Sequence, residues 1–181
     1  MPSIVLPAGP NDPLTRAAFT RMVVKQLFPS FTSQYCFAAL ERKDHADFSL
    51  LFTDVSIKHP DAKYLCMSLL TGIAKGYRDG SFRPDQLITF AEASAILSRA
   101  YVLAPYADMN TKMAWYMPHA EALAARNVIP LTIKGFGHLV TDTETREMLD
   151  RLAEQITWKP SLTLEEVKRG KPFKAVVEVK N

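Results

Sequence analysis

Three groups of residues have the types and spacing to bind a ligand. Arg16 falls in the first turn of a helical pattern, where the helix dipole disfavours a cation unless an anion lies nearby. A guanidinium there offers forked donors to a carboxylate. Arg78 and Arg83 belong to a glycine-rich stretch and are long enough to reach a bound molecule. Trp115-Tyr116 offers aromatic faces on which a sugar ring would stack.

Two of these groups also have a structural interpretation, which we favour for both. The loop is Gly76-Tyr77-Arg78-Asp79-Gly80-Ser81-Phe82. Its glycines permit positive φ, Asp79 caps the turn, and the two aromatic rings anchor it to a core. Aromatic rings at helical positions, such as Trp115-Tyr116, are more often packed in a core than bound to a ligand. Asp54 and Asp108 are expected to cap the helices that follow them.

No short catalytic motif is present in the sequence. It lacks a Gly-rich phosphate loop, an HExxH metal motif and a GxSxG nucleophile motif. The histidines share no spacing typical of a metal site or a catalytic triad, and they are His45, His59, His119 and His138. We therefore predict a chain that is not an enzyme and has neither metal nor cofactor.

The composition is that of a folded protein and argues against two classes of partner. Of the 181 residues, 48% are hydrophobic and 23% are charged. The net charge of +3 belongs to residues 159–181, which hold six Lys/Arg and three Glu. A nucleic-acid binder would carry its basic face on the folded body, so we expect no nucleic acid. No run of 18 apolar residues occurs, so we expect no membrane insertion.

Three helices are predicted to open with the same apolar-Thr pair, which occurs at Leu14-Thr15, at Ile88-Thr89 and at Val140-Thr141. Glu92 and Glu144 stand three residues after their Thr and complete capping boxes, whereas Ala18 leaves the first cap half made. The apolar positions that follow each Thr recur at helical spacing. Three such amphipathic helices are expected to pack around one axis.

A second repeated unit, aromatic-x-Asp-apolar, begins at Phe52 and again at Tyr106, and each precedes a predicted helix, at 61–71 and 114–126. We predict an array of repeats over 1–158: a partial repeat at 1–32, an inserted helix at 33–48, and full repeats at 49–104 and 105–158.

Residues 162–167 and 173–179 alternate apolar and polar side chains, which predicts a β-hairpin tail within 159–181. Cys36 and Cys66 are equally compatible with a disulfide and with two buried thiols.

The run from Phe52 to Glu92 resembles the S-layer homology domain. The family pattern is F-x-D-V, a helix, then G-I-x-x-G-Y-x-D-G-T-F-x-P-x-x-x-I-T-R-A-E. This chain reads Phe52-Thr53-Asp54-Val55, then Gly72-Ile73-Ala74-Lys75-Gly76-Tyr77-Arg78-Asp79-Gly80-Ser81-Phe82-Arg83-Pro84, and closes on Ile88-Thr89-Phe90-Ala91-Glu92. The third copy is a degraded version, and the first is only the closing half.

The resemblance implies a mainly α fold, a pseudo-threefold helical spindle with grooves between its lobes. It also implies a secreted, non-enzymatic module at the cell wall or S-layer. Its partner would be secondary cell-wall polysaccharide or a peptidoglycan-linked glycan, which often carries a pyruvyl ketal. The motif Arg commonly contacts that anion. Only Arg16 occupies its position, since Phe90 and Asp142 replace it in the other copies.

Two functions follow as alternatives. The chain either anchors a surface protein to wall polysaccharide, or it is a degenerate scaffold that assembles with protein partners or with itself. The residues predicted to touch sugar are Arg16, Asp54, Tyr77, Arg78, Asp79, Gly80, Arg83 and Trp115. An Arg16 that lies in an open groove would favour anchoring, and an Arg16 held in an internal ion pair would favour the scaffold.

Overall fold

The computed structural model describes residues 9–32, 34, 36, 50–103 and 113–170. It is mainly helical, as predicted, with six helices and one two-stranded sheet among these residues. The helices are α1 (Arg16–Leu27), α3 (Ala62–Leu70), α4 (Phe90–Ala100), α5 (Met117–Ala124), α6 (Asp142–Glu154) and α7 (Leu164–Arg169). The strands β1 (Leu50–Phe52) and β2 (Val55–Ser56) are antiparallel.

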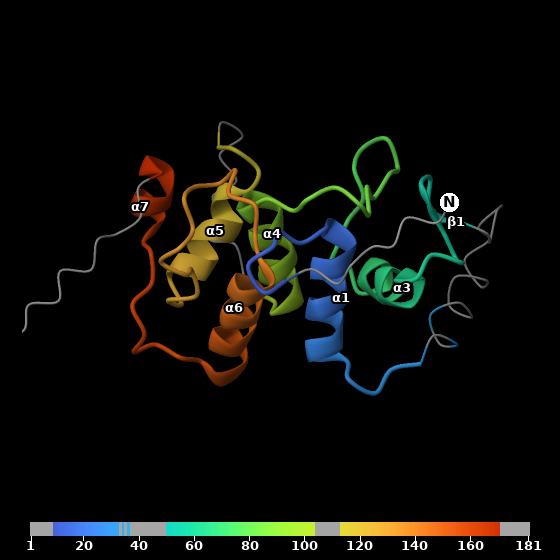
Figure 1. Ribbon diagram of the computed structural model, residues 1–181, viewed down its shortest axis with the longest axis horizontal. Coiled ribbons are helices and arrows are strands. Elements are labelled where there is room, and N and C mark those ends of the chain that lie inside the picture. Colours follow the sequence, from blue (N-terminus) through green and yellow to red (C-terminus); the bar gives the residue numbers. More distant parts are fainter. Residues whose placement is uncertain (1–8, 33, 35, 37–49, 104–112, 171–181) are drawn as a thin grey trace, which may run out of the picture.

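The three helices predicted to open with an apolar-Thr pair, α1, α4 and α6, occupy the middle of the molecule, with α3 on one side and α5 and α7 on the other (Figure 1). The two predicted capping boxes are confirmed at Thr89 and Thr141, and Thr15 accepts only the single bond from the Ala18 amide. Each cap Thr is in an extended conformation, so the chain reaches its helix as a short strand.

Those three extended segments exchange backbone hydrogen bonds in a closed cycle. The Leu14 amide donates to the Val140 carbonyl at 2.8 Å, the Ile88 amide to the Leu14 carbonyl at 2.9 Å, and the Val140 amide to the Ile88 carbonyl at 3.1 Å. We call these three residues the cap ring. Their side chains are buried, with at most 5% exposed. The ring fixes the N-termini of α1, α4 and α6 next to one another.

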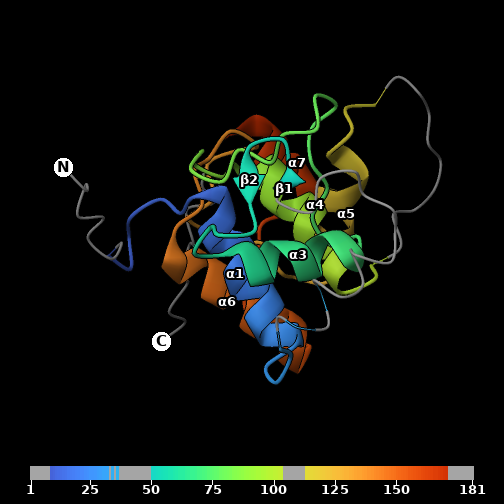
Figure 2. The ribbon, with the colours of Figure 1, turned by 90° about the vertical axis from the view of Figure 1, so that its right-hand side faces the viewer.

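Two outer helices pack on the central ones in the same way. Helix α3 packs against α1, and α5 packs against α4. Figure 2 shows α3 lying across α1. The predicted helices at 61–71 and 114–126 correspond to α3 and α5, each a few residues shorter than expected.

The structure corrects the prediction of a C-terminal β-hairpin. Residues 164–169 form helix α7 instead of a strand, because Thr163 and Glu166 make a full capping box. Alternation over six residues is a weak strand signal beside a cap that satisfies orphan amides. Leu162 and Val167 are buried, each with 1% exposed. The second predicted strand, 173–179, lies outside the described residues.

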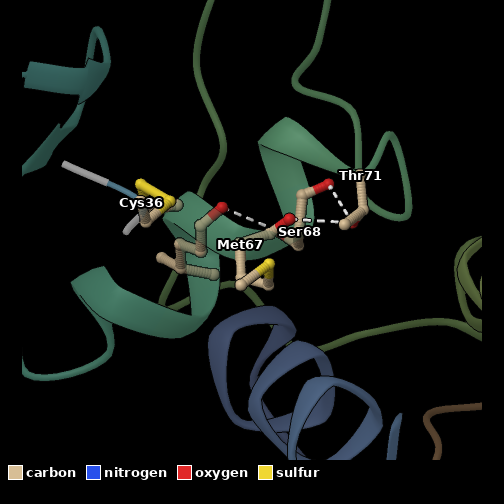
Figure 3. The surroundings of a disulfide bond; sticks show 6 residues. Cys36, Met67, Ser68 and Thr71 are labelled. Carbon is tan, nitrogen blue, oxygen red and sulfur yellow. Dashed lines mark hydrogen bonds between the residues drawn. A yellow bond between two sulfur atoms is a disulfide. The ribbon is translucent and has the colours of Figure 1, made fainter. Parts of the chain in front are cut away.

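A disulfide joins Cys36 to Cys66, with their Cα atoms 6.0 Å apart. It ties Cys36 to α3, as Figure 3 shows beside Ser68 and Thr71. Of the two alternatives for the cysteines, the structure therefore has the bridge. The rest of the predicted inserted helix lies outside the described residues, as does the aromatic-x-Asp-apolar unit that begins at Tyr106.

Candidate functional site

The loop from Gly76 to Pro84 is held in place by Asp54. Its two carboxylate oxygens accept from the amides of Phe82 and Arg83, both at 2.7 Å. The sequence had suggested that Asp54 caps α3. That expectation is wrong, because the Asp54 carboxylate is already bonded to the loop amides. Gly76 packs so tightly that a Cβ would lie 2.8 Å from the Ser81 carbonyl oxygen. Glycine is required at this position for close backbone approach.

Arg16 lies inside the molecule, not in an open groove. Only 6% of the residue is exposed. Its Nε donates to the Phe82 carbonyl at 3.0 Å, and one terminal nitrogen donates to the Lys75 carbonyl at 2.8 Å. The other terminal nitrogen is 3.6 Å from a carboxylate oxygen of Glu92. All three guanidinium nitrogens have internal partners, so Arg16 fastens α1 to the loop.

Tyr77 completes this internal group. Two guanidinium groups lie over its ring, that of Arg16 at 4.9 Å and that of Arg83 at 3.9 Å from the centroid. Its hydroxyl donates to Glu92, which also caps α4. Burial raises the pKa of the Tyr77 hydroxyl, and the hydrogen bond to Glu92 adds to that rise.

Glu92 stays ionised despite its position. Burial alone would raise its pKa, but hydrogen bonds from Tyr77 and from Thr89, together with the charge of Arg16, lower it. The carboxylate therefore serves as the anion for Arg16. The predicted need for an anion near Arg16 is met by this chain itself rather than by a ligand.

The outer edge of the loop is exposed and polar. Arg83 donates to Asp79 at 3.1 Å, and the two side chains are 45% and 57% exposed. Asp79 also accepts from the Ser81 amide and hydroxyl, and these bonds lower the pKa of Asp79 to about 2. Arg78 is exposed beside them. Forked donors and acceptors thus face solvent together, an arrangement that suits sugar hydroxyls.

Arg83 has a strained backbone, with φ at 58°. Within residues 51–94, all of which the structure describes, no other non-glycine residue has positive φ. Such a conformation costs an L-residue roughly 1–2 kcal/mol. Strain of this kind is commonly retained where it directs a side chain for function. Here it accompanies a guanidinium that stacks on Tyr77 and pairs with Asp79.

Phe90 on α4 and Asp142 on α6 stand at the position that Arg16 has on α1, directly after the cap Thr. Phe90 packs in an aromatic series with Phe136, Tyr116 and Trp115, with centroids 6.4, 4.6 and 5.5 Å apart in that order. Trp115 ends this series with 59% of the residue exposed to solvent. Asp142 forms an ion pair with Arg146 on α6.

A groove of about 840 Å³ opens between α1 and α6. None of the eight predicted sugar-binding residues lines it. Its lining comprises Pro13, Leu14, Thr15, Ala17, Ala18, Arg21, Met22, Lys25, Gln26, His59, Pro60, Asp61, Asp85, Asp142, Arg146, Leu149 and Asp150. Sequence reasoning missed this groove because its walls come from four segments that are distant in the sequence. Seven of the eight predicted residues instead gather at or beside the loop, and Trp115 belongs to the aromatic series.

The described residues show neither a metal cluster nor a membrane span. Among them, no three His, Cys, Asp or Glu side chains converge in a way that would hold an ion. No helix in the described part of the chain is both long and apolar enough to cross a bilayer.

Comparison with known families identifies one domain. Residues 51–94 match the S-layer homology domain. The match covers β1, β2, α3, the Gly76–Pro84 loop and the first turn of α4. S-layer homology domains are non-catalytic modules that attach surface proteins to cell-wall polysaccharide. No curated protein matches the chain.

Proposed function

We propose that this chain is a wall-anchoring module, which binds secondary cell-wall polysaccharide and carries a surface protein. The observation that supports it most is the family match, because the matched segment retains the complete Gly76–Pro84 loop. The disulfide between Cys36 and Cys66 agrees with it, since disulfides persist in oxidising compartments outside the cytosol. The chain is proposed to act outside the cell, without catalysis.

We further propose that residues 10–157 form two and a half S-layer homology repeats arranged as a pseudo-threefold spindle. The cap ring supports this proposal, because three equivalent backbone segments bond in one cycle. The docking of α3 on α1 and of α5 on α4 supports it as well.

The glycan contacts are proposed to come from the exposed edge of the loop: Arg78, Asp79 and Arg83. Arg83 has forked donors and an accompanying carboxylate, and its contacts with Asp79 and the Tyr77 ring hold the guanidinium in place. Arg16, Asp54, Tyr77 and Gly80 would shape the loop from behind, without touching sugar. Trp115 is a separate stacking surface in the third repeat.

Sedimentation with purified cell-wall sacculi tests the anchoring function. Wild type is expected to sediment, and Arg83→Ala to bind about tenfold or more weakly, since a charge-assisted hydrogen bond contributes roughly 1.5–3 kcal/mol. The backbone amide of residue 83 still donates to Asp54 in Arg83→Ala, so the loop is expected to be retained. Arg169→Ala removes an exposed guanidinium outside the matched domain and is expected to bind as wild type does. A wild type that stays in the supernatant would refute the anchoring function.

The alternative is a scaffold for protein assembly at the cell surface. The internal position of Arg16 favours it, because the one retained motif arginine is not available to a wall anion. In that case wild type would not sediment with sacculi and would instead self-associate or capture another surface protein.

A further inference from the structure

The groove between α1 and α6 occupies the place where a third outer helix would pack. In the proposed repeats, the outer helix of one repeat packs on the central helix of the repeat before it: α3 packs on α1, and α5 packs on α4. The outer helix of the first repeat would pack on α6, but the described residues before α1 form no helix. The groove therefore opens at a position that an outer helix fills in the other two cases.

The residue directly after the cap Thr shows how the surroundings of α6 differ. On α1 it is Arg16, which donates to carbonyls of the segment that follows α3. On α4 it is Phe90, which stacks on Phe136 in the segment that follows α5. On α6 it is Asp142, which lines the groove and pairs with Arg146 of its own helix. The face that α1 and α4 bury against the next repeat is thus open on α6.

The groove combines apolar surface with negative charge that the described residues leave unpaired. Its apolar lining includes Ala18, Met22 and Leu149, and its charged lining consists of four carboxylates and three Lys/Arg side chains. Two carboxylates are neutralised in the ion pairs Arg21–Asp61 and Arg146–Asp142. Asp85 and Asp150 are exposed, and neither makes a hydrogen bond or ion pair with another described residue.

These features favour an occupant that has both apolar and basic side chains. A purely apolar segment would strip water from Asp150, and burying an unpaired carboxylate is costly. A lysine side chain avoids that cost, because its methylene stem lies along apolar surface while its ammonium group reaches the carboxylate. Lys25, the lysine in the groove lining, is itself placed over the Tyr64 ring at 5.6 Å. The lysines that pair with Asp85 and Asp150 therefore have to come from the occupant.

The segment 171–181, which lies outside the described residues, has the required composition. It holds three lysines and one glutamate, a net charge of +2, and its apolar side chains include Phe173, Val177 and Val179. Eleven residues span at most about 36 Å when fully extended, about twice the roughly 18 Å length of the 12-residue helix α1. The segment is therefore long enough to follow α1 from one end to the other.

The point where this segment begins favours binding to another copy of the chain. The segment follows α7, which lies at one end of the molecule, beyond α5 and away from α1 and α3 (Figure 1). Helix α7 is held there, since Gly170 at its end lies against the Lys134 carbonyl and the Leu162 amide donates to the Ile129 carbonyl at 3.0 Å. The groove, in contrast, is lined by α1 and α6 and by Asp61 at the start of α3.

We propose that segment 171–181 of one copy binds the groove between α1 and α6 of the next copy. Its lysines pair with Asp85 and Asp150, and its apolar side chains pack on Ala18, Met22 and Leu149. Two different surfaces meet in this contact, so copies join head to tail and the contact repeats from one copy to the next. Self-assembly of this kind goes beyond wall anchoring and requires no glycan.

The test reverses the charges on each side of the contact in the full chain. The tail variant is Lys171→Glu/Lys174→Glu/Lys180→Glu, and the groove variant is Asp85→Lys/Asp150→Lys. Sedimentation equilibrium over a range of concentrations measures association, and circular dichroism confirms that each variant is folded. Wild type is expected to associate, and each variant alone to associate about tenfold or more weakly, because like charges then meet in the contact.

An equimolar mixture of the two variants is expected to recover association, since the unchanged lysines of the groove variant meet the unchanged aspartates of the tail variant. The matched control is Glu154→Lys, which reverses an exposed carboxylate of α6 outside the groove and is expected to associate as wild type does.

Three results would overturn the proposal: a wild type that stays monomeric at every concentration, variants that associate as wild type does, or a loss of association that mixing does not restore. None of these measurements involves sacculi. A chain that assembles but does not sediment with sacculi would therefore refute the anchoring function and leave the head-to-tail contact standing.

Discussion

Arg16 shows how a residue with functional chemistry becomes structural when its partners come from the same chain. Its position in the first turn of α1 pointed to an external anion, since the helix dipole disfavours a cation there. In the structure Glu92 supplies the negative charge, and the carbonyls of Lys75 and Phe82 accept hydrogen bonds from the guanidinium. The sequence resemblance alone therefore did not predict that the guanidinium of Arg16 has its partners inside the chain.

Replacing Arg16 with Ala is expected to lower the free energy of unfolding by about 3 kcal/mol, because the change leaves Glu92 and two carbonyls without their partner. Urea denaturation followed by circular dichroism measures the loss. Arg16→Lys, which keeps the charge but not the fork, is expected to fall between wild type and Arg16→Ala. An Arg16→Ala protein as stable as wild type would contradict the internal role.

Glu144 makes the free energy of unfolding depend on pH in the acid range. Burial would raise its pKa, but hydrogen bonds from Thr132, Thr141 and His138 lower it below the ordinary value of 4.5. The folded state thus binds the proton less tightly than the unfolded state, so this stabilisation is present above about pH 4.5 and is lost as pH falls through the lowered pKa.

We expect Glu144→Gln to be less stable than wild type at pH 7 and to lose less stability on acidification. Unfolding free energies from urea titrations between pH 7 and pH 3 measure both effects. The exposed control Glu154→Gln is expected to retain the wild-type slope. A Glu144→Gln slope equal to that of wild type would show that another carboxylate dominates the acid response.

At the scale of elements, the caps of the central helices differ in strength. The full boxes at Thr89 and Thr141 satisfy the cap amide as well as the third amide of the helix, whereas Thr15 satisfies only the latter. The N-termini of α1, α4 and α6 are nevertheless brought together by the same cap ring. The stability of that ring therefore depends more on α4 and α6 than on α1.

Thr141→Ala is expected to cost about 2 kcal/mol of unfolding free energy, and Thr15→Ala about 1 kcal/mol, because the first change breaks a reciprocal box and the second a single bond. Equilibrium urea unfolding of the two single variants provides the comparison. The reverse order would show that the α1 cap contributes more to the stability of the cap ring than its single hydrogen bond indicates.

At the scale of the whole molecule, a disulfide adds to the stability of one hydrophobic core that short helices build together. The disulfide spans a sequence separation of 30 residues and joins the segment at Cys36 to α3. Both sulfur-bearing residues are fully buried. A cross-link over a loop of this length stabilises the fold chiefly by restricting the unfolded chain.

The double variant Cys36→Ser/Cys66→Ser is expected to lose roughly 3–4 kcal/mol of stability. Urea unfolding with and without reductant measures this loss, because reducing the disulfide should lower the stability of wild type as the double substitution does. Insensitivity of wild type to reductant, with no loss in the variant, would contradict a structural role for the bridge.

The sequence by itself determined the local features of this protein. The Thr caps, the loop at 76–84 and the helical class follow from neighbouring residues, because capping and turn chemistry act over three or four positions. Alternation at 162–167 misled the prediction, since a Thr163–Glu166 capping box outweighed it. The run from Phe52 to Glu92 also indicated the family, through residues that lie close together in the chain.

Only the tertiary structure decided which side chains are available for binding. Arg16 is internal because Glu92, 76 positions away, packs against it, and spacing along the chain does not encode that distance. The groove between α1 and α6 exists because helices from opposite ends of the chain meet there, and no outer helix in the described part of the chain covers α6. Burial and pairing are properties of the packed chain, so they appear only once distant segments are brought together.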